Sequence, residues 1–315
     1  MEKNESKRSR SYVISYIIIS VFVIGFAVLS YLSYQKYIAL KNDIKNANSK
    51  YNEMVEQNAN LIYSGEELDK QINEVSDVEN NIKLIKEETF SNISKLEHKI
   101  QNKETKAKIA YLTFDDGPYY NSWKVLDTLD KYGIKATFFT TNINGTKCYD
   151  NKNANCHELY KEYVKRNMTL ANHTYTHAIH KGLYKSVSSF ITAVEKQEQM
   201  ISEITGGYKT NIVRYPGGSG SAKAYKVFTG TSEKLHEMGY GWVDWTAQDG
   251  DGGTGLTTEK AWNNFKGSIG QDIEVVLFHD YSRVTTPLLP KFIEYLQDKG
   301  YLILPLFYDS VMVNK

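Results

Sequence analysis

Three patterns of apolar and polar positions follow one another along the chain, and the first is a long apolar run. Residues 12–32, YVISYIIISVFVIGFAVLSYL, contain no Asp, Glu, Lys or Arg. A helix of this length spans about 30 Å, the thickness of the hydrocarbon core of a bilayer. Basic residues precede the run within 1–11, and we find no cleavage site typical of a signal peptide. The pattern predicts a cytoplasmic N-terminus at 1–11 and an uncleaved transmembrane anchor at 12–32.

The second pattern, over residues 36–106, is a heptad-like repeat in a polar segment. Alternating steps of three and four from Ile44 to Ile100 reach seventeen positions, of which twelve are apolar. A period of 3.5 residues is typical of a coiled coil. We therefore predict a helical stalk at 36–106 that holds the next domain away from the membrane and can pair with a second copy in a homodimer. The alternative is a helical hairpin that packs on itself or on the next domain.

The third pattern, over residues 107–315, is an alternation of short β-rich runs with amphipathic helical segments. Seven strands are predicted, at 108–114, 135–143, 168–173, 211–216, 240–245, 274–280 and 301–307. Helices are predicted between them, at 121–133, 157–167, 186–206, 231–239, 257–269 and 286–300. Such alternation predicts a parallel sheet covered by helices. At this length the leading candidate is an α/β fold of the distorted (β/α) barrel type, with about seven parallel strands.

Charge and cysteine content narrow the function classes. The formal net charge is +1, so no basic excess indicates a nucleic-acid partner. The two cysteines, Cys148 and Cys156, are too few for a disulfide scaffold and lack the spacing of a zinc finger. Two interpretations stay open: a disulfide that closes a small loop, and two unrelated thiols.

Polar side chains gather where the predicted strands end, which is the active-site face of a (β/α) barrel. They are Asp115, Asp116, His173, His177, Arg214, Asp249, Asp251, His279 and Asp280. A helical turn that begins at His173 would place His177 on the same side, where both imidazoles can share a metal ion. Asp115 or Asp116 would be the third ligand, and the other aspartate would stay free as a base. Zn²⁺ is the default ion for this set, which also suits Co²⁺, Ni²⁺ or Fe²⁺.

Four short motifs carry a resemblance to a known family. In this order and at these spacings, TFDDG, HTYTH, RYPGG and LFHD resemble the motifs of the polysaccharide deacetylases, the family of the NodB homology domain and of carbohydrate esterase family 4. The match covers about residues 107–308. The variant RYPGGSGS, followed by VDWTAQDGD, is most similar to the branch of membrane-anchored Gram-positive enzymes that act on peptidoglycan.

The resemblance implies a role for each matching residue. It implies a divalent metal, most commonly Zn²⁺, bound by Asp116, His173 and His177, with Asp115 as the general base, Arg214 as its partner, and His279 as the general acid. Asp251 would orient His279, and Asp249 is the alternative for that role. Gly217 would supply a backbone N–H to the oxyanion, and Leu277 would line the acetyl pocket. Independently of the family, Tyr175 and Trp245 are candidates for stacking on sugar rings.

These roles together predict an extracellular enzyme of the Gram-positive cell envelope. It would hydrolyse the N-acetyl group of N-acetylglucosamine in peptidoglycan strands, release acetate, and so confer lysozyme resistance. The alternatives are a deacetylase of another polymer, such as poly-N-acetylglucosamine, chitin-like oligomers or acetylxylan, and a catalytically inactive wall-binding scaffold. A further alternative makes the stalk an assembly partner for other envelope proteins.

Overall fold

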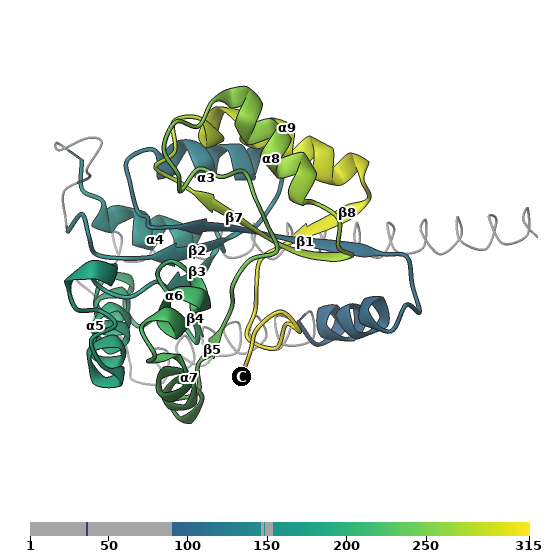
Figure 1. Ribbon diagram of the computed structural model, residues 1–315. Helices are drawn as coiled ribbons and strands as arrows, with labels where there is room; N and C mark the ends of the chain where they lie inside the picture. Colours follow the sequence, from purple (N-terminus) through teal and green to yellow (C-terminus); the bar gives the residue numbers. More distant parts are fainter. Residues whose placement is uncertain (1–35, 37–89, 146–147, 149–153) are drawn as a thin grey trace, which may run out of the picture. The chain divides into compact units, whose positions relative to one another are not determined.

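The computed structural model describes residues 36, 90–145, 148 and 154–315 (Figure 1). The chain divides into two compact units, 1–79 and 80–315, and the fold described below belongs to the second. The predicted anchor at 12–32 and most of the predicted stalk at 36–106 lie outside the described residues, so both stay predictions. Among the described residues, no helix is long and apolar enough to cross a membrane.

The centre of the domain is a sheet of eight strands, and every pairing between named strands is parallel. The strands are β1 (Lys108–Asp115), β2 (Thr137–Thr140), β3 (Thr169–Asn172), β4 (Ile212–Val213), β5 (Gly241–Trp242), β6 (Ala247–Gln248), β7 (Ile273–His279) and β8 (Tyr301–Leu304). Their order is β5-β4-β3-β2-β1-β7-β6, and β8 pairs with the first half of β1. The predicted parallel sheet is confirmed.

All seven predicted strands are present, and the sheet has one further short strand. The sequence pattern missed β6, because its two residues lie among polar ones, whereas the equally short β4 and β5 lie within longer β-rich runs. Where the structure describes the chain, no pairing joins β5 to β6, so the sheet does not close into a complete barrel.

Helices cover the outer face of the sheet, as Figure 1 shows for α3, α8 and α9. They are α3 (Ser122–Lys131), α4 (His157–Lys165), α5 (Val187–Thr205), α6 (Gly218–Ala224), α7 (Phe228–Glu237), α8 (Thr258–Ser268), α9 (Thr285–Asp298) and the 3₁₀ helix η1 (Ile179–Lys181). Neighbouring helices touch in the order α8, α9, α3, α4, α5 and α7. The six predicted helices are all present, whereas the short α6 and η1 were not predicted.

Both faces of the sheet are buried, which is typical of parallel strands. Alternate residues of β1, such as Leu112 and Phe114, join an outer core beneath the helices. The other alternate residues of β1, such as Ile109 and Tyr111, join an inner core on the opposite face. The strands therefore read as continuous apolar runs, and polar residues begin where the strands end.

A helix at residues 90–101 precedes β1 and packs on the inner core. Phe90 stacks on Phe307 with ring centroids 5.0 Å apart, and Ile100 is buried. Glu97 is completely buried, and its carboxylate accepts hydrogen bonds from the Tyr111 hydroxyl at 2.7 Å and from two groups near the C-terminus. Within the segment 36–106, the described helix 90–101 therefore packs on the domain that follows it. Packing on the next domain was part of the alternative to a free stalk.

Candidate metal centre and active site

β1 ends at two aspartates whose carboxylates meet different partners. Asp115 is the last residue of the strand and is 3% exposed, and Asp116 follows it with φ +68°. Positive φ is uncommon for a residue with a Cβ atom. The turn lets Asp115 pair with Arg214, while Asp116 faces two histidines.

His173 follows β3, and His177 lies four residues later, but no helical turn joins them. Thr174 and His177 have φ values of +63° and +47°, and η1 begins only at Ile179. The helical turn considered for His173 and His177 is therefore absent. A loop with left-handed residues takes its place and sets the two imidazole rings with their centroids 5.0 Å apart.

Asp116, His173 and His177 form a candidate metal centre, called the metal triad below. Asp116 Oδ1 lies 3.5 Å from His173 Nε2 and 3.3 Å from His177 Nε2. Two atoms that each bind a tetrahedral Zn²⁺ at about 2.0–2.1 Å lie about 3.3–3.4 Å apart, so the observed spacing fits a shared ion. Among the described residues, Asp116 Oδ1 is also buried without a hydrogen-bond partner, which is costly unless a cation meets it.

The other ring nitrogen of His173 prepares it for metal binding. Nδ1 lies 2.8 Å from the backbone oxygen of Arg214, and a carbonyl can only accept, so Nδ1 carries the proton and Nε2 keeps its lone pair. Burial lowers the pKa of His173 to about 4, so the ring is neutral at pH 7. Three protein ligands of this kind leave a coordination position for water or substrate.

Arg214 follows β4 and is completely buried. Its Nη1 donates to Asp115 Oδ1 at 2.8 Å and to Thr113 Oγ1 at 2.7 Å, while Nε and Nη2 donate to the backbone oxygens of Val243 and Asp244. The ion pair balances two buried charges, and the further hydrogen bonds fix the guanidinium. The remaining oxygen of Asp115, Oδ2, then faces the metal triad, 3.6 Å from His173 Nε2.

His279 ends β7 and is held by Asp251. The Asp251 carboxylate accepts from His279 Nδ1 at 2.7 Å and from the His279 backbone N–H at 2.8 Å. Burial alone would lower the pKa of His279, but the hydrogen bond to Asp251 and its negative charge raise it to about 9. His279 Nε2 lies 3.8 Å from Asp116 Oδ2, so the ring faces the metal triad. Asp251, rather than Asp249, is the residue in contact with the His279 ring.

Sequence interpretation missed a supporting role for Asp280. Its Oδ2 accepts from Ser122 Oγ at 2.5 Å and from the Tyr163 hydroxyl at 3.3 Å. A Cβ atom on Gly117 would lie 2.2 Å from the same oxygen, so glycine is needed where the turn after Asp116 meets Asp280. An acidic residue directly after an apolar strand was the available signal.

Three further predicted substrate contacts lie near these groups. Gly217 has φ +70° and precedes α6, in the segment that follows Arg214. Leu277 is two residues before His279 on β7, so both side chains leave the same face of the strand. The Trp245 ring lies 5.9 Å from the Arg214 guanidinium. Their contacts with substrate stay predictions.

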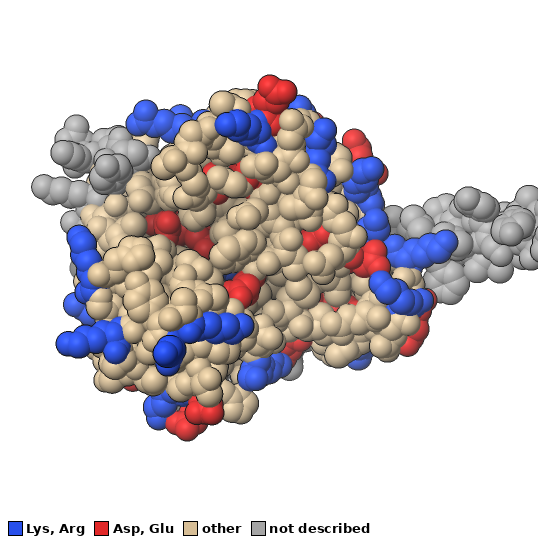
Figure 2. Space-filling model, in the orientation of Figure 1, with Lys and Arg blue, Asp and Glu red and all other residues tan. Residues whose placement is uncertain are grey.

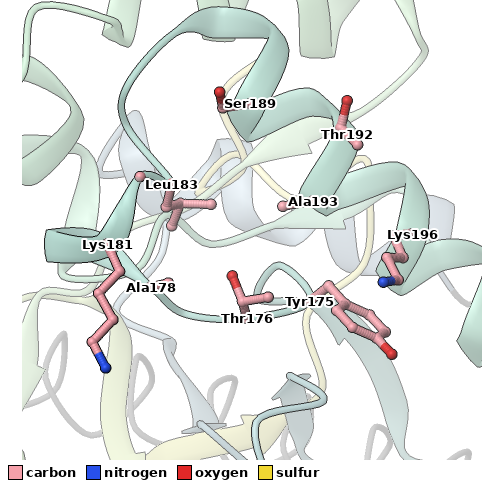
Figure 3. A pocket seen from close by; sticks show the side chains of 10 residues that line it. Tyr175, Thr176, Ala178, Lys181, Leu183, Ser189, Thr192, Ala193 and Lys196 are labelled. Carbon is pink, nitrogen blue, oxygen red and sulfur yellow. The ribbon is translucent and has the colours of Figure 1, made fainter.

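Tyr175, the fourth predicted contact, lines a surface hollow of about 290 Å³ together with Thr176 and Ala178, the two residues that flank His177 in the sequence (Figure 3). One side of the hollow is the loop after His173, and the other is α5. Lys181 and Lys196 also line it, and the Lys196 ammonium lies 4.1 Å from the centre of the Tyr175 ring. The hollow therefore combines an apolar floor with two exposed positive charges.

Charged side chains are unevenly distributed over the face shown in Figure 2. Lys and Arg side chains lie mainly around its rim, whereas acidic side chains reach the surface both at the rim and nearer its middle. In the loop after β2, Cys148 and Cys156 are buried and form a disulfide. Of the two interpretations of these cysteines, the disulfide is the one observed.

The chain is similar to known polysaccharide deacetylases. The family model described as "Polysaccharide deacetylase" matches residues 102–232. The solved catalytic domain of a peptidoglycan N-acetylglucosamine deacetylase from Eubacterium rectale is 33% identical, with a TM-score of 0.59, over 66% of this chain and 92% of that one. A putative polysaccharide deacetylase of Bacillus subtilis, YheN, is 30% identical over 62% of this chain, which spans 65% of that relative's length.

One of the similar structures is that of a pseudoenzyme. It is a CE4 family pseudoenzyme from Bacillus anthracis, 23% identical with a TM-score of 0.51, and the match covers 64% of each chain. At this identity the likeness concerns the fold alone. Whether a chain with this fold is active is therefore decided by the residues of its site.

Proposed function

Because the chain belongs to the polysaccharide deacetylase family, we propose that it hydrolyses the N-acetyl group of N-acetylglucosamine in peptidoglycan and releases acetate. One observation carries the proposal: the metal triad adjoins both an arginine-paired aspartate and an aspartate-paired histidine. This set provides a metal site, a base and an acid within a few ångströms of one another. The intact set also disfavours the alternative of an inactive wall-binding scaffold.

The metal triad would hold a divalent cation, for which Zn²⁺ is the first candidate and Co²⁺ or Ni²⁺ the next. When bound, such an ion polarises the amide carbonyl and lowers the pKa of a bound water. Asp115 is the base, because Arg214 holds one of its oxygens and leaves Oδ2 toward the triad. Oδ2 accepts a proton from the water that attacks the carbonyl carbon.

His279 is the acid that completes the reaction. Its Nδ1–H is held by Asp251, which favours the cationic ring and leaves the Nε2 proton directed toward the triad. As the carbon–nitrogen bond breaks, Nε2 donates this proton to the amine, and acetate and a glucosamine unit are the products. We assign the backbone N–H of Gly217 to the oxyanion, where one such donor is typically worth about 3 kcal/mol. Leu277 would line the site of the acetyl methyl group.

The hollow beside Tyr175 favours a negatively charged polymer. Peptidoglycan strands carry carboxylates on their peptide substituents, whereas chitin-like oligomers carry no charge. Lys181 and Lys196 would attract the charged strand, and Tyr175 would offer an aromatic surface for a sugar ring. These features support peptidoglycan over the other polymers named above.

We further propose that the enzyme is anchored in the cell membrane with its catalytic domain outside. The apolar segment 12–32 supports an anchor. The Cys148–Cys156 disulfide supports an oxidising compartment, because such bonds are rare in the cytosol. Lysozyme resistance would follow, since a free amine alters the glycan that lysozyme recognises.

Acetate release by the purified full chain tests the proposed function. Peptidoglycan and N-acetylglucosamine oligomers would be compared after chelation and after addition of Zn²⁺ or Co²⁺, with Asp115→Asn as the inactive control. We expect metal-dependent release from peptidoglycan that is lost in the variant. Release from the oligomers alone would instead support another polymer, and release from neither would support the scaffold.

A further inference from the structure

Asp249 lies behind the pair formed by Asp251 and His279, and its carboxyl group has no role in the mechanism above. It is completely buried in the loop after β6. Its Oδ1 accepts from the Asp251 backbone N–H at 3.1 Å, and its backbone oxygen accepts from the Asn264 amide of α8 at 3.0 Å. Its Oδ2 lies 2.7 Å from Thr285 Oγ1, at the start of α9.

Thr285 joins the two carboxyl groups through a single hydroxyl. Its Oγ1 lies 2.8 Å from Asp251 Oδ2 as well as 2.7 Å from Asp249 Oδ2. The hydroxyl has one hydrogen, so it can donate to one of these oxygens but not to both. The second short contact between oxygens needs a proton from elsewhere, because two buried lone pairs at this distance repel each other.

The third neighbour of Thr285 does not supply that proton to a carboxyl oxygen. Ser282 Oγ lies 2.8 Å from Thr285 Oγ1 and accepts the Thr285 backbone N–H at 3.1 Å. Toward Thr285 Oγ1 it is likewise placed as an acceptor and not as a donor. The lone pairs of Thr285 Oγ1 are therefore free to accept a hydrogen, and a protonated carboxyl group is the donor at hand.

Asp249 is the carboxyl group that carries this proton. Asp251 already accepts two N–H groups from His279, which stabilises it as the carboxylate. The Asp249 carboxyl faces one backbone N–H, the Thr285 hydroxyl and the negative Asp251. Burial, and then the charge of Asp251, raise the pKa of Asp249 to about 7, in agreement with the hydrogen count.

We propose that Asp249 is a positioning residue that is held as the neutral acid and acts on the general acid through Thr285. Asp249 donates its Oδ2 proton to Thr285 Oγ1, Thr285 donates to Asp251 Oδ2, and Asp251 is thereby fixed against His279. The chain of hydrogen bonds explains why two acidic residues, two apart in sequence, are both buried here. The inference rests on the proposed role of His279 as the acid.

Infrared difference spectroscopy tests the protonation without any substrate. The spectrum of the full chain minus that of Asp249→Asn, at pH 6, should contain the carbonyl stretch of a protonated carboxylic acid. Carboxylate bands in its place would overturn the proposal. Because no turnover is needed, this result stands even if the proposed deacetylase activity fails.

Kinetics test the positioning role. Asp249→Asn keeps a donor for Thr285 and an acceptor for the Asp251 N–H, so it should retain activity close to that of the native enzyme. Asp249→Ala should lower kcat by about 10- to 100-fold with little change in KM, the usual range for groups that orient a catalytic residue. Thr285→Ser should retain activity and Thr285→Val should lose it, with thermal unfolding as the folding control. An Asn variant as impaired as the Ala variant would overturn the proposal.

Discussion

Glu97 offers a direct test of how the helix 90–101 is joined to the domain. Its carboxylate accepts hydrogen bonds from the Tyr111 hydroxyl at 2.7 Å, from Ser310 Oγ at 2.5 Å and from the Val311 N–H at 3.1 Å. Glu97→Ala would leave all three donors without this acceptor in a buried site. Each unsatisfied buried group costs about 1–3 kcal/mol. Because the native enzyme also bears the cost of burying Glu97, the net loss should fall near the lower end of the sum, at about 3–5 kcal/mol.

Urea and thermal unfolding of the full chain, followed by circular dichroism, measure this loss. A domain of this size loses about 2–4 °C in Tm for each kcal/mol, so we expect a decrease of roughly 10 °C. Lys99→Ala is the matched control, because Lys99 is exposed on the same helix. Glu97→Gln should be intermediate, since its amide oxygen replaces one of the two acceptor atoms. A Glu97→Ala variant within about 1 kcal/mol of the control would refute the reasoning, because a surface change of this kind typically has so small an effect.

Three further outcomes follow from the site. After a chelator has removed bound metal, addition of Zn²⁺ at about 100 times its Kd should raise the Tm of the chain by roughly 5–10 °C. His177→Ala should abolish this rise. The double variant Lys181→Ala, Lys196→Ala should raise KM for peptidoglycan by about three- to tenfold at low salt and leave KM for uncharged oligomers unchanged; equal effects on both would contradict a charge-based preference. The pKa of Asp249 is raised in the folded state to about 7, above the unfolded value, so its contribution to stability is present at pH 4 and is lost as pH rises to 7. By linkage this loss of stability should be absent in Asp249→Asn, and parallel stability curves of the two proteins from pH 4 to 8 would contradict it.

Local patterns in the sequence were sufficient to predict most of the helices and strands. The helix predicted at 186–206 is α5, because Ser186 accepts a hydrogen bond from the Ser189 N–H at its start and Gly206 ends it with φ +76°. Such signals act within a few residues and can be recognised in one dimension. β6 was missed because its two residues lie among polar ones, and α6 was missed because seven residues carry too little periodicity.

The residues of the candidate site could be predicted from the sequence, but their arrangement in space could not. The motifs placed Asp116, His173 and His177 together by resemblance, but the backbone path that brings them together was not predicted. The expected helical turn is a loop, and positive φ at Asp116 and His177 sets the distances between the ligand atoms. Backbone strain of this kind depends on the packing that holds it, which no spacing of residues reveals.

The sequence by itself determined the alternation of elements, the parallel sheet and the residue types at the ends of its strands. These follow from burial, because a strand covered on both faces must be apolar until it reaches the active-site edge. Tertiary structure alone decided which groups meet across long separations: Glu97 with Tyr111 and Ser310, or Thr285 with Asp249 and Asp251. The physical reason is that the partner of a buried polar group is chosen by the fold, which must satisfy every such group at once, wherever it lies in the chain.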